Sequence, residues 1–171
     1  MDTRLQQATF DAWLREHAAI LHHVANGFAT GVDRHDLMQE LMIALWRAIP
    51  AFRADARSST YIFRVTHNAA LTWKRTERNY RRKLNTFQEQ QSGAPLVVES
   101  SGAGADANPL ELLYAAIRAL EPLDRSLVLL HLDELSYAQI AEIHGLSESN
   151  VGVRLSRLKH KLTAKLQEKM P

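Results

Sequence analysis

The sequence of 171 residues is long enough for one ordinary domain or two small ones, and its 46% hydrophobic and 23% charged residues are typical of globular proteins. The absence of cysteine excludes disulfide bonds, thiolate zinc sites and cysteine nucleophiles. No apolar run approaches the roughly 20 residues of a membrane span and the first residues do not form a secretory signal, so we expect a soluble protein of the cytoplasm.

The net charge of +2 conceals an uneven distribution along the chain. Residues 61–84 carry seven basic and one acidic side chain, and residues 147–171 carry six and two. Residues 85–109 hold three acidic side chains and no basic one. Two basic segments separated by an acidic one favour binding to a polyanion.

Sparse proline and glycine, with almost no alternating β-branched residues, predict an all-helical protein. Helices are expected over residues 8–28, 33–49, 58–83, 109–120, 122–132, 136–143 and 147–168. The polar stretch Thr86–Asn108 cannot bury a core and predicts a flexible linker. We therefore expect two small helical domains, residues 1–85 and 109–171, joined by a linker over residues 86–108.

The expected helix over residues 33–49 has two dissimilar faces. One is an ordinary core stripe of Leu37, Leu41, Leu45 and Ala48. The other combines charged groups with large apolar side chains: Asp36, Gln39, Glu40, Ile43, Trp46 and Arg47. An aromatic anchor inside a polar rim is typical of a protein–protein interface. The alternative is that another helix of the same domain covers Trp46 and Ile43.

The expected helix over residues 58–83 carries a basic stripe on one face: Arg64, Asn68, Leu71, Arg75 and Arg78. The opposite face is expected in the core: Ile62, Val65, Ala69 and Trp73. Basic side chains around one asparagine suit a nucleic-acid backbone with one base read directly, although solubility alone also explains the arginines. The polar loop before this helix has Phe52 and Tyr61 at its ends, which suits capture of an extruded base by stacking. Core packing is the alternative for Phe52.

Residues 136–162 have the spacing of a DNA-binding helix-turn-helix, with an ordinary helical hairpin as the alternative. Ser136 and Ser147 are suited to cap two successive helices, and Gly145 supplies the turn between them. In the second helix a heptad-like repeat is expected to face the core: Val151, Leu155, Leu158, Leu162 and Leu166. The opposite face presents residues suited to base edges: Ser149, Asn150, Val153, Ser156, Arg157 and His160. Basic residues suited to phosphates flank it: Arg154, Lys159, Lys161 and Lys165.

The segment Asp36-Leu-Met-Gln-Glu-Leu-Met-Ile-Ala-Leu-Trp46 closely resembles the polymerase-binding helix of bacterial sigma factors, which has the pattern Asp-Leu-x-Gln-Glu…Trp. Together with the helix-turn-helix, it makes the chain similar to the extracytoplasmic-function class of the sigma-70 family, which keeps sigma domains 2 and 4 and a linker. The resemblance covers about residues 10–84 and 110–168. It implies a sigma factor that binds the β′ clamp and β flap of core RNA polymerase and directs promoter-specific initiation.

The resemblance also implies a role for each matching residue. The residues that would dock on the β′ clamp are Asp36, Gln39, Glu40, Ile43 and Trp46. Those that would melt and hold the minus-10 element are Phe52, Tyr61, Arg64, Asn68, Lys74, Arg75 and Arg78. Those that would bind the minus-35 element are Ser149, Asn150, Val153, Arg154, Ser156, Arg157, Lys159 and Lys161. The acidic linker would either thread the RNA exit path of the polymerase or serve as a solvated tether.

The chain departs from the family pattern at three positions. Tyr61 stands where the class usually has tryptophan, which leaves the fit to the duplex at the melting fork open. Gly152 and Val153 stand where many members have a basic residue and a serine, which leaves the target sequence open. Glycine inside a helix costs about 1 kcal/mol relative to alanine, so Gly152 either allows a close approach to a phosphate or occupies a tolerant position.

The sequence carries little sign of other chemistry. His17, His22 and His23 lie near one another, but no carboxylate pattern completes a metal site. Neither a Gly-rich phosphate loop nor a nucleophile elbow is present, so we expect no cofactor, no metal and no enzymatic activity. Two other functions compete with that of a sigma factor: a helix-turn-helix regulator that acts without polymerase, and an interaction module that binds polymerase or a regulator without initiating. An anti-sigma factor is a further candidate partner, because many family members are held inactive by one.

Overall fold

The computed structural model describes residues 2–53, 57–91 and 108–168, and within these ranges all regular secondary structure is helical. The expected all-α fold class is therefore confirmed. Among the described residues, no helix is both long and apolar enough to cross a membrane.

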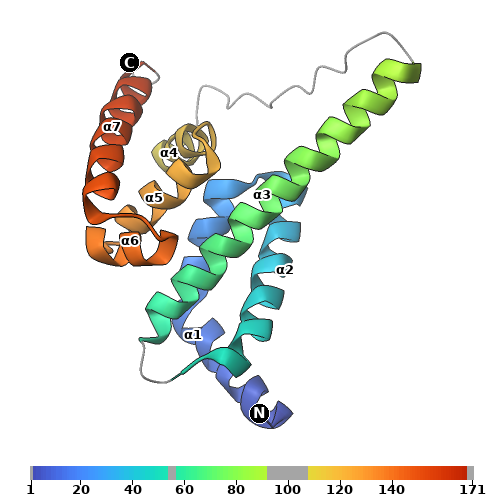
Figure 1. Ribbon diagram of the computed structural model, residues 1–171, viewed down its shortest axis with the longest axis vertical. Helices are drawn as coiled ribbons and strands as arrows, with labels where there is room; N and C mark the ends of the chain where they lie inside the picture. The colour runs from blue at the N-terminus through green and yellow to red at the C-terminus, as the bar shows by residue number, and fades with distance from the viewer. Residues whose placement is uncertain (1, 54–56, 92–107, 169–171) are drawn as a thin grey trace.

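The first region of the fold consists of three helices that pack on one another (Figure 1). They are α1 (Thr3–Phe28), α2 (Gly31–Ala48) and α3 (Ser58–Gln91), with a short 3-10 turn, η1 (Ile49–Ala51), after α2. The core stripe expected on α2 is confirmed, because Leu37, Leu41 and Leu45 are fully buried. They pack in one apolar core with residues of α1 and α3: Trp13, Leu21, Val24, Phe28 and Ile62.

The second region contains the remaining helices, α4 (Pro109–Arg118), α5 (Pro122–Leu132), α6 (Tyr137–His144) and α7 (Glu148–Gln167). The Ser136 hydroxyl accepts from the Gln139 N–H at 3.2 Å, and the Gln139 side chain accepts from the Ser136 N–H at 2.9 Å, which forms a capping box at the start of α6. Gly145 ends α6 in the left-handed conformation at φ +65°, where glycine is favoured. Ser147 then caps α7 through the Asn150 N–H. The helix-turn-helix is thus built by the residues expected from the sequence.

Two helix ends differ from the sequence prediction by more than two residues. α1 begins at Thr3 rather than at residue 8, because the Asp2 side chain caps it by accepting from the Arg4 N–H at 3.1 Å. α3 continues to Gln91 and so includes the first residues of the expected linker over 86–108. No glycine or proline lies between Ser58 and residue 93, so neither residue type ends the helix earlier. Figure 1 shows the last turns of α3 projecting from the helical body. Residues 92–107 of that linker lie outside the described residues.

The two regions pack directly against each other. Gly27 of α1 lies against Leu129 of α5 so closely that a Cβ atom on Gly27 would come within 2.5 Å of a Leu129 methyl carbon. His23 of α1 pairs with Asp133 at 2.7 Å, and Arg118 of α4 donates to the carbonyl of Asn26 at 2.8 Å. The core is therefore continuous from one region to the other, which the sequence did not predict.

Candidate nucleic-acid interface

The outer face of α7 is free in the structure. The side chains expected to reach base edges are all exposed, and Val153 keeps 50% of its surface accessible. The inner face is buried as expected, through Val151, Leu155 and Leu158. Lys159 and Lys161 are exposed, whereas Arg154 forms an ion pair with Asp124 of α5 at 3.0 Å. Arg154 would have to leave that carboxylate in order to contact a phosphate.

Gly152 of α7 faces α6 at an ordinary distance. A Cβ atom at this position would lie 3.6 Å from the nearest ring atoms of Tyr137, which is a normal van der Waals contact. Packing within the described part of the chain therefore does not require glycine at residue 152. The tolerant-position reading of Gly152 and the close-approach reading both remain compatible with this contact.

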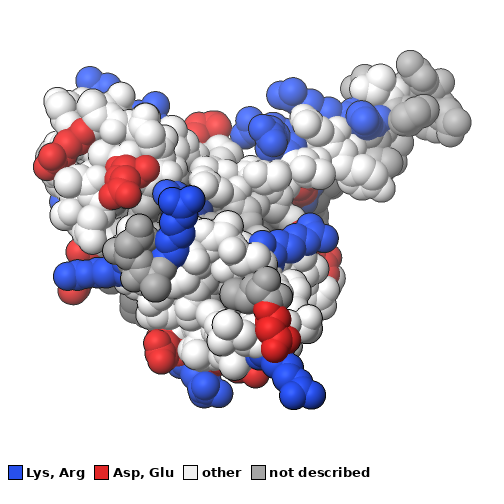
Figure 2. Space-filling model, turned by 60° about the horizontal axis from the view of Figure 1, so that its bottom comes forward, with Lys and Arg blue, Asp and Glu red and all other residues white. Residues whose placement is uncertain are grey.

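The basic stripe on α3 is exposed. Arg64, Asn68 and Arg75 are all accessible, and Arg78 reaches Glu121 of the second region at 3.3 Å across an exposed gap. Figure 2 shows basic side chains gathered along the part of α3 that projects from the body. Lys74 lies elsewhere: it is partly buried, and its Nζ pairs with Glu77 at 2.6 Å. The structure thus keeps most of the expected minus-10 residues on one face and separates Lys74 from them.

An aromatic cluster stands where the loop joins α3. Phe52 is half-buried and packs edge-on against Trp13, with ring centres 5.2 Å apart, and against Tyr61 at 5.1 Å. The Tyr61 hydroxyl donates to the carbonyl of Ala48 at 2.9 Å, and the Arg64 guanidinium lies 5.4 Å from the centre of the Tyr61 ring. Phe52 is therefore partly buried against the core, and its predicted role in base capture stays a prediction. Residues 54–56 of the loop lie outside the described residues.

Sequence reasoning missed Trp13 as a member of this cluster. Trp13 is almost completely buried and supports both Phe52 and Tyr61. Its spacing to the core residues Ile20 and Val24 is seven and eleven residues, which is the period of one helix face. That signal was available in the sequence, although it does not identify the rings on which Trp13 would pack.

The candidate polymerase-binding face of α2 is only partly free. Asp36, Gln39 and Glu40 are exposed, and Ile43 keeps 41% of its surface accessible. Trp46 is half-buried, because its ring meets Phe10 of α1 edge-on at 5.5 Å. Ile43 is therefore accessible to a partner, as the interface interpretation expects, whereas Trp46 is partly covered by another helix, as the alternative expects.

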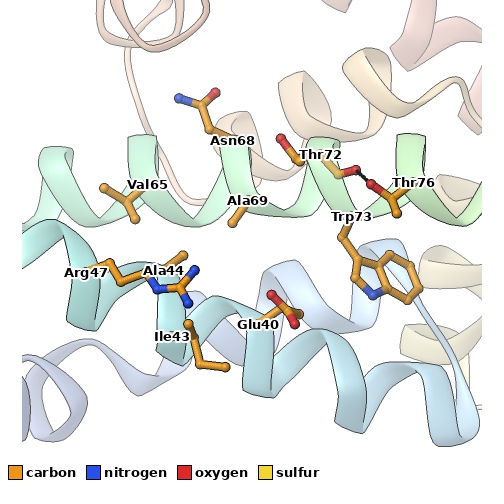
Figure 3. Close-up of a pocket in the computed structure, with 10 residues that line it drawn as sticks. All are labelled: Glu40, Ile43, Ala44, Arg47, Val65, Asn68, Ala69, Thr72, Trp73 and Thr76. Carbon is orange, nitrogen blue, oxygen red and sulfur yellow. Dashed lines mark hydrogen bonds between the residues drawn. The ribbon is translucent and has the colours of Figure 1, made fainter.

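A groove of about 570 Å³ joins the exposed faces of α2 and α3 (Figure 3). Its walls are formed by Glu40, Ile43, Ala44 and Arg47 of α2 and by Val65, Asn68, Ala69, Thr72, Trp73 and Thr76 of α3. Val65, Ala69 and Trp73 were expected in the core, but they are half-buried and line this groove. The prediction is confirmed for Ile62, which is fully buried, but the closed side of α3 continues through Thr66 and Ala70 rather than through these three residues.

Models of known protein families match both regions of the chain. The model described as sigma-70 region 2 matches residues 9–80, and the model described as sigma-70, region 4 matches residues 110–162. The two matches span 72 and 53 of the 171 residues, and so cover most of the chain. The chain belongs to the sigma-70 family. It is an RNA polymerase sigma factor, which binds core RNA polymerase and promoter DNA and directs promoter-specific initiation. Sigma factors are not enzymes.

Curated relatives agree with the family, and solved structures agree with the fold. The sigma factor is 29% identical to the RNA polymerase sigma-H factor of Bacillus licheniformis over 82% of this chain and 71% of that protein. It is 27% identical to the sigma-H factor of Bacillus subtilis (strain 168) over 82% of this chain and 73% of that protein. Its fold is similar to that of the sigma factor RpoE from Bartonella quintana, solved with the anti-sigma factor NepR, at a TM-score of 0.65 and 20% identity over 93% and 97% of the two chains. Its fold is also similar to that of CnrH, solved in complex with the cytosolic domain of CnrY, at a TM-score of 0.62 and 21% identity over 95% of this chain and 90% of that chain.

The buried contact between the two regions of the sigma factor contains two histidines. His67 of α3 is completely buried, and its Nδ1 atom lies 2.5 Å from the Ser126 hydroxyl, which in turn lies 2.9 Å from Nε2 of His144. Burial, and then the nearby His144 and His23, lower the pKa of His67 to about 3. Burial also lowers the pKa of His144. Both rings are therefore neutral at physiological pH, and nothing in the sequence pattern singled them out.

The histidines His17, His22 and His23 do not gather into a metal site within the described ranges, since no group of three or more potential ligands is found there. His23 instead pairs with Asp133 of the second region.

Proposed function

We propose that the sigma factor binds the β′ clamp of core polymerase through the exposed part of α2, formed by Asp36, Gln39, Glu40 and Ile43. The observation that carries this proposal is the exposure of Ile43 among three polar side chains, on a face that continues through the groove of Figure 3 to the basic stripe of α3. An apolar side chain inside a polar rim suits a protein partner, and the adjoining cations suit DNA held beside that partner. A helix-turn-helix regulator that acts alone has no need of this first face.

Promoter DNA would then contact two surfaces of the chain. The arginines of α3, with Asn68, hold the minus-10 strand, and the outer face of α7 reads the minus-35 duplex in the major groove. Support comes from the exposure of Arg75 and Arg78 on one surface and of Asn150 and Arg157 on the other. Arginine pairs with the edge of guanine in two hydrogen bonds, so Arg157 contributes to the choice of sequence, whereas Lys161 binds phosphates.

The proposed domain boundaries follow the regions that the family models match. We assign residues 1–85 to sigma domain 2, residues 86–108 to the acidic linker and residues 109–171 to sigma domain 4. An anti-sigma factor is a further partner in this proposal, which is supported by the similarity in fold to an RpoE solved in complex with one.

The experiment is reconstituted transcription on genomic fragments with purified core polymerase and the full chain. The proposal expects promoter-specific transcripts, and their absence would leave only the regulator or the interaction module. Ile43→Arg is expected to weaken core binding at least tenfold. Leu110→Arg is the matched control, because Leu110 is an exposed apolar residue of α4, 56% accessible and outside the proposed face.

Ile43 is a better probe than Trp46. Removing the Trp46 ring would also remove its edge contact with Phe10, so a loss of binding would mix with a loss of stability. If Ile43→Arg and Leu110→Arg bind core polymerase with equal affinity, the assignment of this face fails even if the chain initiates transcription.

A further inference from the structure

A second cavity, of about 440 Å³, lies between the two regions of the sigma factor. Its walls come from the α1–α2 junction, from α3 and from α4, α5 and α7: Phe28, Ala29, Thr30, Asp33, Trp73, Lys74, Glu77, Arg81, Ala115, Arg118, Ala119, Arg125 and Lys165. It shares only Trp73 with the groove of Figure 3. Because the cavity draws on both regions, it exists only while they are packed together.

The lining of this cavity has an excess of positive charge. Five cationic side chains face two carboxylates, those of Asp33 and Glu77. Both carboxylates are already engaged: Glu77 pairs with Lys74 and Arg81, and Arg81 also reaches Asp33 at 3.7 Å. Arg118 pairs with Glu111. Within the described part of the chain, no carboxylate forms an ion pair with the other two cations, Arg125 and Lys165.

Arg125 is the unusual member of this set. Only 8% of its surface is accessible, yet its Nε atom donates to a neutral acceptor, the carbonyl of Leu120 at 2.8 Å. Its guanidinium lies 5.8 Å from the centre of the Phe28 ring. Burial lowers the pKa of Arg125, and the nearby carboxylates of Glu121 and Glu77 oppose this lowering only in part. Buried charges are ordinarily paired, because the penalty for an unpaired one is several kcal/mol. An anion in the cavity would supply the missing partner.

The start of α2 adds donors to the same cavity. Thr30, which lines the cavity, is the N-cap of this 18-residue helix, but its side chain forms no capping hydrogen bond. The first N–H groups of a helix point outward and carry the positive end of the helix dipole, so they favour an anion. The donors of α2 therefore reinforce the charge of Arg125 rather than compete with it.

We propose that this cavity binds a small phosphorylated molecule of about nucleotide size. Arg125 and Lys165 would neutralise the phosphate, for which the planar guanidinium is suited because it donates two parallel hydrogen bonds. The half-buried ring of Trp73 borders the same space and offers an apolar surface to a base. The volume lies within the range of about 300–1,000 Å³ that is usual for small-molecule sites. Since residues of both regions contact the ligand, binding would stabilise their packed arrangement.

The test uses the full chain with ATP and inorganic pyrophosphate as probes, measured by calorimetric titration and by the shift in Tm. We expect saturable binding of at least one probe at one site, with a rise in Tm. Lys165→Gln and Arg125→Lys should each weaken binding about tenfold, the second because it keeps the charge but loses the planar fork. Lys83→Gln is the matched control, since Lys83 is an exposed lysine outside the cavity.

Three outcomes would overturn the proposal: no binding of either probe, equal binding by Lys165→Gln and Lys83→Gln, or binding of a polyglutamate peptide but of neither phosphate probe. The second would place the anion on the exposed basic surfaces instead. Tighter binding of ATP than of pyrophosphate would support the contribution of the aromatic wall. None of these results depends on polymerase binding, so the proposal stands or falls separately from the proposed function.

Discussion

Lowering the pH should separate the two regions of this sigma factor through His67. The ring is buried between α3, α5 and α6, where it faces Ser126, His144 and, further away, His23. The pKa of His67 is about 3 in the packed state, against about 6.5 for a histidine in water. Because the pKa is lowered by packing, the stabilisation is fully present above pH 6.5 and is lost progressively as the pH falls towards 3.

The size of this effect follows from the two pKa values. At pH 7.5 the His67 ring is neutral in both the packed and the separated state, so its protonation hardly changes the stability of the packed state. At pH 5.5 the ring is about ten to one protonated in the separated state, where it is exposed, and still neutral in the packed state, where it is buried. The packed state therefore loses about 1.4 kcal/mol of stability relative to the separated state. This figure changes little if the pKa of the buried ring is 4 instead of 3, because both values lie well below 5.5. The lowered pKa of His144 acts in the same direction.

The assay is urea unfolding of the full chain at pH 7.5 and 5.5, for the wild type and for His67→Asn. The amide of asparagine does not titrate and keeps a polar group towards Ser126. We expect the wild type to lose about 1.4 kcal/mol more than the variant between the two pH values. Pairs that both proteins share, such as His23–Asp133, cancel in this comparison. His160→Asn, at an exposed position of α7, controls for the substitution itself. If the wild type and His67→Asn lose the same free energy, the buried-histidine reasoning is refuted.

Four further substitutions test the packing and the DNA-binding helix. Gly152→Ala should raise the free energy of unfolding by about 0.5–1 kcal/mol, because the new methyl group finds only a normal contact at 3.6 Å; a loss of stability in urea unfolding would contradict this. Gly27→Ala should lower the free energy of unfolding by about 1–3 kcal/mol, since the methyl group would collide with buried Leu129. An unchanged midpoint of urea unfolding would contradict this, because it would mean that α5 shifts freely. Lys161→Ala should weaken binding to all promoter sequences alike and reduce the slope of log affinity against log salt by about one, whereas Arg157→Ala should change the preferred minus-35 sequence. Fluorescence anisotropy on a set of duplexes distinguishes the two variants. Identical sequence preferences and salt slopes for the two variants would refute the assignment.

The sequence was most informative where local chemistry alone decides the structure. The ends of α6 and α7 depend on Ser136, Gly145 and Ser147, each of which acts on backbone groups within a few residues. The outer face of α7 follows from the repeat of Val151 and Leu155. Once these residues are buried, the helical period fixes the direction of all the remaining side chains of the helix. Such relations need no knowledge of the rest of the fold.

Residues on apolar faces were harder to place. Periodicity identified an apolar aspect of α3, but it did not say whether Trp73 would be covered or would line a groove. It also did not say that Trp46 would meet Phe10 or that Phe52 would meet Trp13. Each of these contacts joins separate elements, so no local pattern contains it.

The sequence by itself determined that the chain is helical, that its helix-turn-helix starts and stops where it does, and that two basic surfaces are separated by an acidic segment. It also indicated the family, through one motif confined to a single helix and another that spans two successive helices. Only the tertiary structure decided that the two regions pack together, with Gly27 against Leu129 and His67 buried beside Ser126. The physical reason is that helix formation and capping depend on neighbours in the sequence, whereas the burial of a side chain depends on which distant surface happens to fit it.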